Sequence, residues 1–396
     1  MTDRALGPVA PTAIETFAIV LKPRSEKAVT QFVAAVTNKN SAQYHQYLPR
    51  GAFGSRFGPS PATIARVRSV IEGDGLHAVV SSNHLMVIAH GSASQIEKAF
   101  GTGLESYHLA TGGMGQATTG VPSLPSTIAR SVTGIVGLDD LITAQPSYII
   151  PRGSSQSHGF KSAKHGDVPS VAGAATPCSD AQQAAAGSGG LTDDQIANSY
   201  GAFGLYSQGD VGAGQHIAIF EQQPFVTSDI ATFDTCYFGA TAASQMVGRL
   251  SVVPVDGGEL QPGPGSVNAE ANLDIEDVSA IAPQAAIDVY ETPNTSFGTL
   301  DGYTQIVNND TDQVISTSWA VCEQLAQAAE PGLQQAENLV FQQAAAQGQT
   351  MFAAAGDTGN DSCNSFRLVP TPAGQNLLSL LDPASQPYVV STGGTT

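Results

Sequence analysis

The chain has 396 residues, enough for two or three domains, and 41% of them are hydrophobic, enough for a sizeable core. With 16 Lys and Arg against 34 Asp and Glu, the formal charge is −18, which argues against a nucleic-acid partner. No apolar run approaches the roughly eighteen residues of a transmembrane helix, so no membrane partner is expected. The first residues lack the charged and apolar regions of a signal peptide, and none is expected.

The charge is unevenly distributed. Before residue 171, 14 Lys and Arg face 10 Asp and Glu, a net charge of +4; from residue 171 onward, Arg249 and Arg367 face 24 acidic residues, a net charge of −22. Seven of the eight histidines also precede residue 171, the exception being His216. The split predicts that the first segment docks on the second. Because acid charges histidines and neutralises carboxylates, we expect acidification to weaken this docking.

The first part of the chain predicts a compact α+β domain that ends near Tyr148. Its apolar patterns and helix caps indicate the order β-α-α-β-β-α-β. The expected strands are 14–22, 76–82, 84–90 and about 106–109, and the expected helices start after Ser25, at Ser60 and at residue 93. Residues 150–190, rich in Ser, Gly and Ala, are interpreted as a linker that is accessible to proteolysis.

From about Leu191 the pattern alternates between strands and helices. Expected strands lie at 215–221, 285–291, 313–319 and 350–356, and expected helices at about 268–281, 297–309 and 333–347. This alternation predicts a doubly wound parallel sheet, in which active groups collect at the carboxyl ends of the strands. Glu221, Trp319 and Asp357 fall at such ends.

The four cysteines, Cys178, Cys236, Cys322 and Cys363, predict disulfides rather than zinc, since they form no CxxC and no Cys/His cluster. Their order suggests the pairs 178–236 and 322–363, although four cysteines allow three pairings. Disulfides would place the protein outside the cytosol.

Glu270 and Asp274 stand four residues apart in a helical stretch, so they share one helix face. Two carboxylates this close resist double ionisation, which suits acid–base chemistry at low pH. A solvated acidic helix face is the alternative for this spacing taken alone. Asp277 lies on the same face and is interpreted as a solvated residue.

Several longer segments resemble the sedolisin family of serine-carboxyl peptidases. They are EANLDIEDVSAIAPQAAIDVYETPN, VISTSWAVCE, MFAAAGDTGNDSC and PASQPYVVSTGGTT. The first part resembles the family's activation prodomain through YLPRGAFGSRFGPS and LMVIAHGSASQIEKAFGTGLESY. The resemblance implies a subtilisin-like parallel sheet, incomplete at its C-terminal end, after an α+β, ferredoxin-like prodomain. The expected domains are the prodomain at 1–149, a linker with the maturation site at 150–190, and a partial peptidase domain at 191–396.

The resemblance also implies roles for individual residues of an acid-acting endopeptidase or tripeptidyl peptidase. Glu270 matches the general base of a Ser-Glu-Asp triad, Asp274 the carboxylate that orients it, and Asp357 the oxyanion-hole aspartate. Glu221 and Trp319 match positions that extend the hydrogen-bond network. Ser318 and Ala320 belong to the edge segment that pairs with a peptide or protein substrate, with Ala320 in place of the usual Gly.

These roles are chemically consistent with low pH. A carboxylate base with a pKa near 4 remains partly ionised in acid, where histidine would be protonated. An aspartate can donate a hydrogen bond to an oxyanion only when it is protonated, and we expect acid and partial burial to favour that state for Asp357.

The family's nucleophilic serine lies in a GTSxxxP motif, and no GTS occurs in the chain. We therefore expect the nucleophile, and the ligands of the family's calcium site, to lie beyond Thr396, and the chain alone to be an inactive part of a longer secreted proenzyme. No metal ligand is expected within the chain.

Two other functions stay open. A prodomain with a degenerate partner would act as an inhibitor or binding module. Asp357-Thr358-Gly359 matches the aspartic-peptidase signature, but that fold is β-rich and needs two such loops or a dimer. A His-type subtilisin is disfavoured, because His216 starts a strand and is interpreted as structural.

Overall fold

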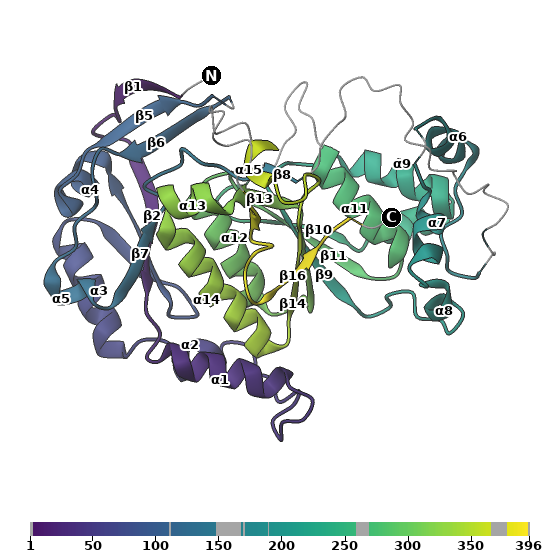
Figure 1. Cartoon of the computed structure of the whole chain (residues 1–396), viewed down its shortest axis with the longest axis horizontal. Coiled ribbons are helices and arrows are strands. Elements are labelled where there is room, and N and C mark those ends of the chain that lie inside the picture. The colour runs from purple at the N-terminus through teal and green to yellow at the C-terminus, as the bar shows by residue number, and fades with distance from the viewer. Residues whose placement is uncertain are drawn as a thin grey trace. The chain divides into compact units, whose positions relative to one another are not determined.

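The computed structural model describes residues 3–110, 112–147, 168, 171–188, 190–258, 269–365 and 378–394. The chain forms two compact units (Figure 1). The first comprises residues 1–147, 293–310 and 319–396, and the second comprises residues 148–292 and 311–318. Within the described part of the chain, helices long and apolar enough to cross a membrane are absent. Most of the predicted linker at 150–190, with His158 and His165, lies outside the described residues.

The first unit begins with a four-stranded antiparallel sheet whose strand order is β3-β4-β2-β7. Its strands are β2 (Ile14–Leu21), β3 (His77–Val80), β4 (Met86–Ser92) and β7 (Val132–Val136). Helices α1 (Glu26–Thr37), α2 (Ala52–Phe57) and α3 (Pro61–Gly73) lie between β2 and β3, and α4 (Ala93–Phe100) and α5 (Ser126–Ala129) between β4 and β7. This connectivity is that of a ferredoxin-like domain, which confirms the prediction.

One strand of the prediction was assigned to the wrong sheet. The strand expected near residues 106–109 exists as β5 (Leu104–His108), but it pairs in a separate sheet of order β1-β5-β6. Its partners are β1 (Arg4–Pro8) and β6 (Met114–Thr118). The fourth ferredoxin-like strand is β7 instead, because β7 supplies Val132 and Val136 to the buried side of the sheet.

The predicted helix starts are confirmed by their caps. The Ser25 and Ser60 side chains accept hydrogen bonds from the backbone N–H groups of Ala28 and Thr63. Ser92 and Gln95 form a capping box at the start of α4. The helices cover a core that includes Phe17, Ile19, Val67, Ile96 and Phe100.

The remainder of the first unit comes from later parts of the chain. It contains α12 (Ser296–Asn309), α13 (Glu323–Ala329), α14 (Pro331–Gln347) and α15 (Ser362–Ser365). β14 (Thr350–Ala354) pairs in parallel with β16 (Val389–Thr392), and β13 (Trp319–Cys322) lies between β8 (Gln145–Pro146) and β15 (Leu381–Asp382) in antiparallel pairing. Helices α12 and α14 pack against each other and against β7 (Figure 1). A disulfide joins Cys322 to Cys363.

The second unit is built on parallel strands in the order β10-β11-β9-β12. These are β9 (His216–Glu221), β10 (Leu250–Pro254), β11 (Ala286–Glu291) and β12 (Val314–Thr317). The same unit contains six described helices: α6 (Ser179–Ser188), α7 (Asp193–Ser199), α8 (Phe203–Tyr206), α9 (Thr227–Phe238), α10 (Ala240–Val247) and α11 (Ala269–Ile281). A second disulfide joins Cys178 to Cys236, so both predicted pairings are confirmed.

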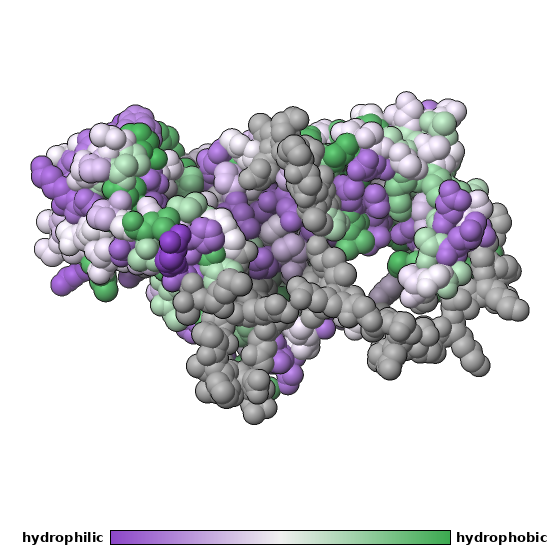
Figure 2. Space-filling view, turned by 90° about the horizontal axis from the view of Figure 1, so that it is seen from above, coloured by the Kyte–Doolittle hydropathy of each residue, from purple (hydrophilic) through white to green (hydrophobic). Residues whose placement is uncertain are grey.

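The predicted α/β class with a parallel sheet is therefore confirmed. One face of the strands in the second unit packs on α9 and α11 through a core that includes Ile219, Ile230, Ile275 and Val289. The expected strand at 313–319 is divided, since β12 ends at Thr317 and β13 begins at Trp319. On the face seen in Figure 2, hydrophobic residues form separate patches among hydrophilic ones.

Candidate active site

Helix α11 carries the two carboxylates on which the sequence argument depends. Ala271 and Ile275 face the core under the sheet, and this contact fixes the rotation of the helix. Glu270 and Asp274 flank that apolar stripe, one residue earlier in each turn. Glu270 is 2% exposed, so the solvated-face alternative does not hold for it.

Asp274 is held by two side chains at the carboxyl ends of strands. Ser318 follows β12, and its Oγ donates a 2.9 Å hydrogen bond to Asp274 Oδ1. Glu221, the last residue of β9, shares a hydrogen bond with the same carboxyl group. Burial raises the pKa of Asp274 to about 6, against the lowering effect of both hydrogen bonds. Two carboxyl groups hydrogen-bond only when one of them carries a proton, so this pair is suited to acid.

A third buried carboxylate lies at the same level of the sheet. Glu291 ends β11 directly opposite Glu221, and the two are 2% and 0% exposed. Sequence analysis did not single out Glu291. The signal was present, because the strands HIAIFE and AIDVYE both end in an aromatic residue followed by Glu.

An acidic cluster continues along α11 beyond Asp274, and Asp277 is part of it. Asp277 hydrogen-bonds the carboxyl group of Asp193, and desolvation by the surrounding groups together with this neighbour raises the pKa of Asp277 to about 7. Burial and the charges of Asp193 and Asp234 also raise the pKa of Glu276 to about 7. The side chain of Asp277 is exposed, as predicted, but it belongs to this acidic cluster and does not stand alone.

In the first unit, β13 is the segment that the resemblance assigned to substrate pairing. Trp319 and Ala320 are buried, at 3% and 2% exposed. They pair antiparallel with Pro146 and Gln145 of β8, at the end of the ferredoxin-like domain. A strand from the first part of the chain thus occupies one edge of β13, in the manner of an added β-strand.

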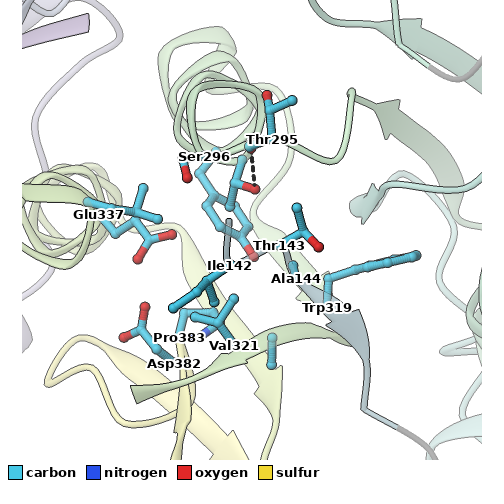
Figure 3. Close-up of a pocket in the computed structure, with 14 residues that line it drawn as sticks. Ile142, Thr143, Ala144, Thr295, Ser296, Trp319, Val321, Glu337, Asp382 and Pro383 are labelled. Carbon is cyan, nitrogen blue, oxygen red and sulfur yellow. Dashed lines mark hydrogen bonds between the residues drawn. The ribbon is translucent and has the colours of Figure 1, made fainter. Parts of the chain in front are cut away.

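A pocket lies beside this pairing, bounded by Thr143, Ala144 and Trp319 on one side (Figure 3). Its opposite side carries the carboxyl groups of Glu337 and Asp382. These two groups are hydrogen-bonded to each other, and burial raises the pKa of both. Sequence analysis missed them, because an isolated acidic residue in a helix or before a Pro is usually exposed.

Asp357 follows β14 in the first unit, after a turn at Gly356, whose φ of +82° suits glycine. Its side chain is exposed rather than partly buried. The expectation that Asp357 is partly buried was therefore wrong.

The first part of the chain docks on α12 and α14 through named contacts within the first unit. The Gly137 N–H donates to Glu330 Oε1 at 2.9 Å, the Ser296 N–H donates to Asp140 Oδ1 at 2.9 Å, and Asn83 Nδ2 donates to Gln343 Oε1 at 3.0 Å. A Cβ atom on Gly134 would lie 2.6 Å from Gly332 Cα, so β7 and α14 meet at backbone distance.

The titratable groups where the first part of the chain contacts α12 and α14 do not show the expected attraction between a basic and an acidic segment. Burial raises the pKa of Asp310, and the hydrogen bond from Gln347 and the charge of Arg50 oppose this effect. Burial also raises the pKa of Asp140 to about 7 and that of Glu330 well above its ordinary value. These two groups are neutral in acid, and they favour docking there. The contacts thus argue against acid-weakened docking at this patch.

Comparison with known proteins finds relatives for most of the chain. A model of the pro-kumamolisin activation domain matches residues 4–141. Kumamolisin of Bacillus sp. (strain MN-32) is 29% identical over 358 residues, which cover 88% of this chain and 56% of the relative. Sedolisin of Pseudomonas sp. (strain 101) is 27% identical over 384 residues, or 96% of this chain and 59% of the relative. The chain is thus similar to kumamolisin and sedolisin over most of its length, and its first part matches their kind of activation domain.

Human tripeptidyl-peptidase 1 (Homo sapiens) is a further relative, 27% identical over 99% of this chain and 63% of its own length. The chain thus spans about half to two thirds of the length of these curated relatives. A solved structure of Pseudomonas sedolisin with two molecules of pseudo-iodotyrostatin overlaps 46% of this chain and 48% of that chain, with a TM-score of 0.37 and 25% identity.

Proposed function

We propose that the chain is part of the zymogen of an acid-acting serine-carboxyl peptidase, which hydrolyses peptide bonds with a Ser-Glu-Asp triad. The observation that carries the proposal is the arrangement on α11: Glu270 is buried, and Asp274 one turn later is held by Ser318 and Glu221 at the carboxyl ends of parallel strands. Active groups of α/β proteins collect at these ends.

In this proposal Glu270 is the general base. It accepts the proton of the attacking serine hydroxyl, which the family places outside the chain, and later returns a proton to the leaving amine. Asp274 orients Glu270, and Ser318 and Glu221 orient Asp274. Asp357, protonated in acid, donates a hydrogen bond to the developing oxyanion. No step uses the family's calcium site, whose ligands are expected beyond Thr396.

The zymogen part of the proposal rests on β8. The substrate of such an enzyme is a peptide that adds as a strand to the edge carrying Trp319 and Ala320. Gln145 and Pro146 already pair with those two residues. We infer that the ferredoxin-like domain is an intramolecular inhibitor, that a cut in 150–190 precedes activity, and that the two disulfides reflect an extracellular location.

The two alternative functions, an aspartic peptidase and a non-catalytic inhibitor or binding fragment, each meet one structural observation. Asp357 follows a strand in parallel pairing with β16, an α/β setting unlike that of an aspartic peptidase. The occupied edge of β13 would also suit a non-catalytic inhibitor or binding fragment, so the test must separate an enzyme from a fragment.

The test is to read the gene downstream of codon 396 and to express the whole reading frame. We expect a GTSxxxP motif, digestion of denatured protein substrates between pH 3 and 5, and a loss of about 10⁴-fold in kcat for Glu270→Gln. Glu26→Gln, an exposed residue of α1, is the matched control and should leave activity unchanged. A stop codon directly after Thr396, or full activity of the Glu270→Gln variant, would overturn the proposal.

A further inference from the structure

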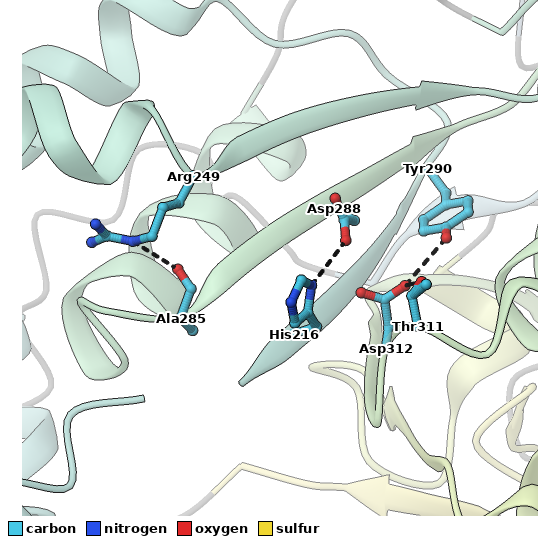
Figure 4. A network of polar contacts seen from close by, with 7 residues as sticks. All are labelled: His216, Arg249, Ala285, Asp288, Tyr290, Thr311 and Asp312. Atoms are coloured by element: carbon cyan, nitrogen blue, oxygen red, sulfur yellow. Dashed lines mark hydrogen bonds and ion pairs between the residues drawn. The ribbon is translucent and has the colours of Figure 1, made fainter. Parts of the chain in front are cut away.

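A second group of chemistry-bearing side chains lies at the amino ends of the strands, at the edge opposite Glu221 and Ser318. His216 begins β9, Asp288 is the third residue of β11, and Asp312 lies two residues before β12. One ligand atom from each of the three lies within 4.8 Å of the others, and His216 Nδ1 is 3.6 Å from Asp288 Oδ2 (Figure 4).

Strand register explains why these residues meet. His216 pairs with Ala286 across the parallel β9–β11 ladder, and Asp288 is two residues farther along β11. Side chains two residues apart point to the same face, so His216 and Asp288 share one face of the sheet. Tyr290 lies on that face as well. Asp312 reaches the same place from the loop that enters β12, which pairs with β9 on its other side.

The carboxyl group of Asp312 is oriented by neighbouring hydroxyl groups. Asp312 is 0% exposed, Thr311 Oγ1 donates to its Oδ2 at 2.9 Å, and the Tyr290 hydroxyl donates to the same oxygen at 3.2 Å. Hydrogen bonds of this kind hold metal-binding carboxylates in place and are typical of metal sites. The Arg249 side chain donates hydrogen bonds to the backbone oxygens of Ala285 (Figure 4) and Pro283, and not to the three ligand residues.

The site is accessible from solvent. The side chain of His216 is 51% exposed and that of Asp288 is 20% exposed, whereas Asp312 forms the buried floor. An ion could therefore enter past the imidazole, and water could complete its coordination sphere.

We propose that His216, Asp288 and Asp312 bind a divalent transition-metal ion of the zinc class. An imidazole nitrogen with two carboxylate oxygens is a donor set that suits Zn²⁺, whereas Ca²⁺ and Mg²⁺ favour oxygen ligands alone. The two carboxylates balance the charge of the ion. Bound there, the metal would connect the N-terminal parts of β9 and β11 to the loop that precedes β12. We therefore assign it a stabilising rather than a catalytic role.

The proposal departs from the expectation that the chain holds no metal ligand. It is also separate from the family's calcium site, whose ligands are expected beyond Thr396. The competing interpretation is a metal-free cluster in which His216 forms an ion pair with Asp288, and Asp288 hydrogen-bonds Asp312.

The test is titration of the purified chain with Zn²⁺ at pH 7 by calorimetry, because metal ligands must be free of protons to bind. We expect one strong site and a rise in the melting temperature with Zn²⁺ concentration. His216→Gln keeps a polar side chain beside Asp288 but removes the imidazole, and it should weaken this site at least about ten-fold. Thr311→Val, at an exposed position, should weaken it by a smaller factor.

The matched control addresses the other imidazole pair of the chain. His77 and His90 lie opposite each other on β3 and β4 with ring centroids 4.7 Å apart, and both are exposed. The double variant His77→Gln/His90→Gln should retain the strong site. Equal Zn²⁺ binding by His216→Gln and the unaltered chain, or loss of the strong site in the His77/His90 variant, would overturn the proposal, as would equally strong binding of Ca²⁺ at the same site.

Discussion

The Ser318 hydroxyl donates a 2.9 Å hydrogen bond to Asp274 Oδ1 and so favours the ionised form of the carboxylate proposed to orient the catalytic base. A hydrogen bond to a charged group stabilises the charged form by about 1.5–3 kcal/mol. Ser318→Ala should therefore raise the pKa of Asp274 from about 6 by about one to two units. Carbon-detected NMR titration of the Asp274 carboxyl measures this without any need for activity.

Ser207→Ala provides the control for that titration, since Ser207 is exposed and its hydroxyl bonds the Gly204 carbonyl oxygen. It should leave the titration of Asp274 unchanged. An unchanged titration in Ser318→Ala as well would mean that the hydroxyl does not stabilise the carboxylate.

The close approach of Gly134 and Gly332 predicts a steric effect on docking. A methyl group on Gly134 would meet the α14 backbone, and such overpacking typically costs about 1–3 kcal/mol. Gly134→Ala should lower the free energy of unfolding by this amount in urea denaturation. Gly73→Ala is the control, because open space surrounds Gly73 in α3 and alanine favours helices there. Equal stability of the two variants would contradict the contact.

The buried Glu330 carboxyl predicts how docking responds to pH. Its folded pKa is raised, so the folded state binds the proton more tightly than the unfolded state does, for which the ordinary value is 4.5. The stabilisation is complete below pH 4.5 and is lost as pH rises through the folded pKa. Asp140, with a pKa of about 7, acts in the same direction.

Unfolding measured from pH 4 to 8 should therefore show a stability that falls toward neutral pH, by at most about 1.4 kcal/mol per pH unit for each proton. Glu330→Gln keeps an oxygen acceptor for the Gly137 N–H and should flatten this slope. Glu26→Gln should retain the slope of the unaltered chain. A slope in Glu330→Gln as steep as in the unaltered chain would exclude Glu330 as its source.

The Cys322–Cys363 disulfide links β13 to the helix that follows the Asp357 loop, across 41 residues of sequence. Loop-closure entropy for this length corresponds to about 4 kcal/mol. Cys322→Ala with Cys363→Ala should lower stability by up to that amount and should increase hydrogen exchange in residues 357–362. Unaltered exchange in that loop would show that other contacts hold it.

Part of this architecture follows from local patterns. Ser25, Ser60 and Ser92 cap helices as predicted, because a cap depends on residues within one turn. The pairing of cysteines also followed their order. The face of α11 that carries Glu270 and Asp274 could be predicted from the four-residue spacing.

Features that depend on distant partners could not be predicted. The segments RALGP and MGQAT carry no alternating pattern of β-branched residues, so β1 and β6 were missed. β8 has two residues and exists because β13 offers an edge. The burial of Glu330 and Glu337 and the exposure of Asp357 result from tertiary packing, which residue type does not encode.

A chain of hydrogen bonds between side-chain amides on and around α14 has a consequence for activation. Asn83 bonds Gln343, Gln343 bonds Asn308 and Gln347, and Gln347 bonds the Val307 carbonyl oxygen. None of these groups gains or loses a proton between pH 3 and 8. The alignment of the ferredoxin-like domain on α14 is thus specified by neutral groups that acid does not alter. We expect the domain to remain seated in acid until the chain is cut, so that proteolysis, and not titration, determines when the edge of β13 becomes available.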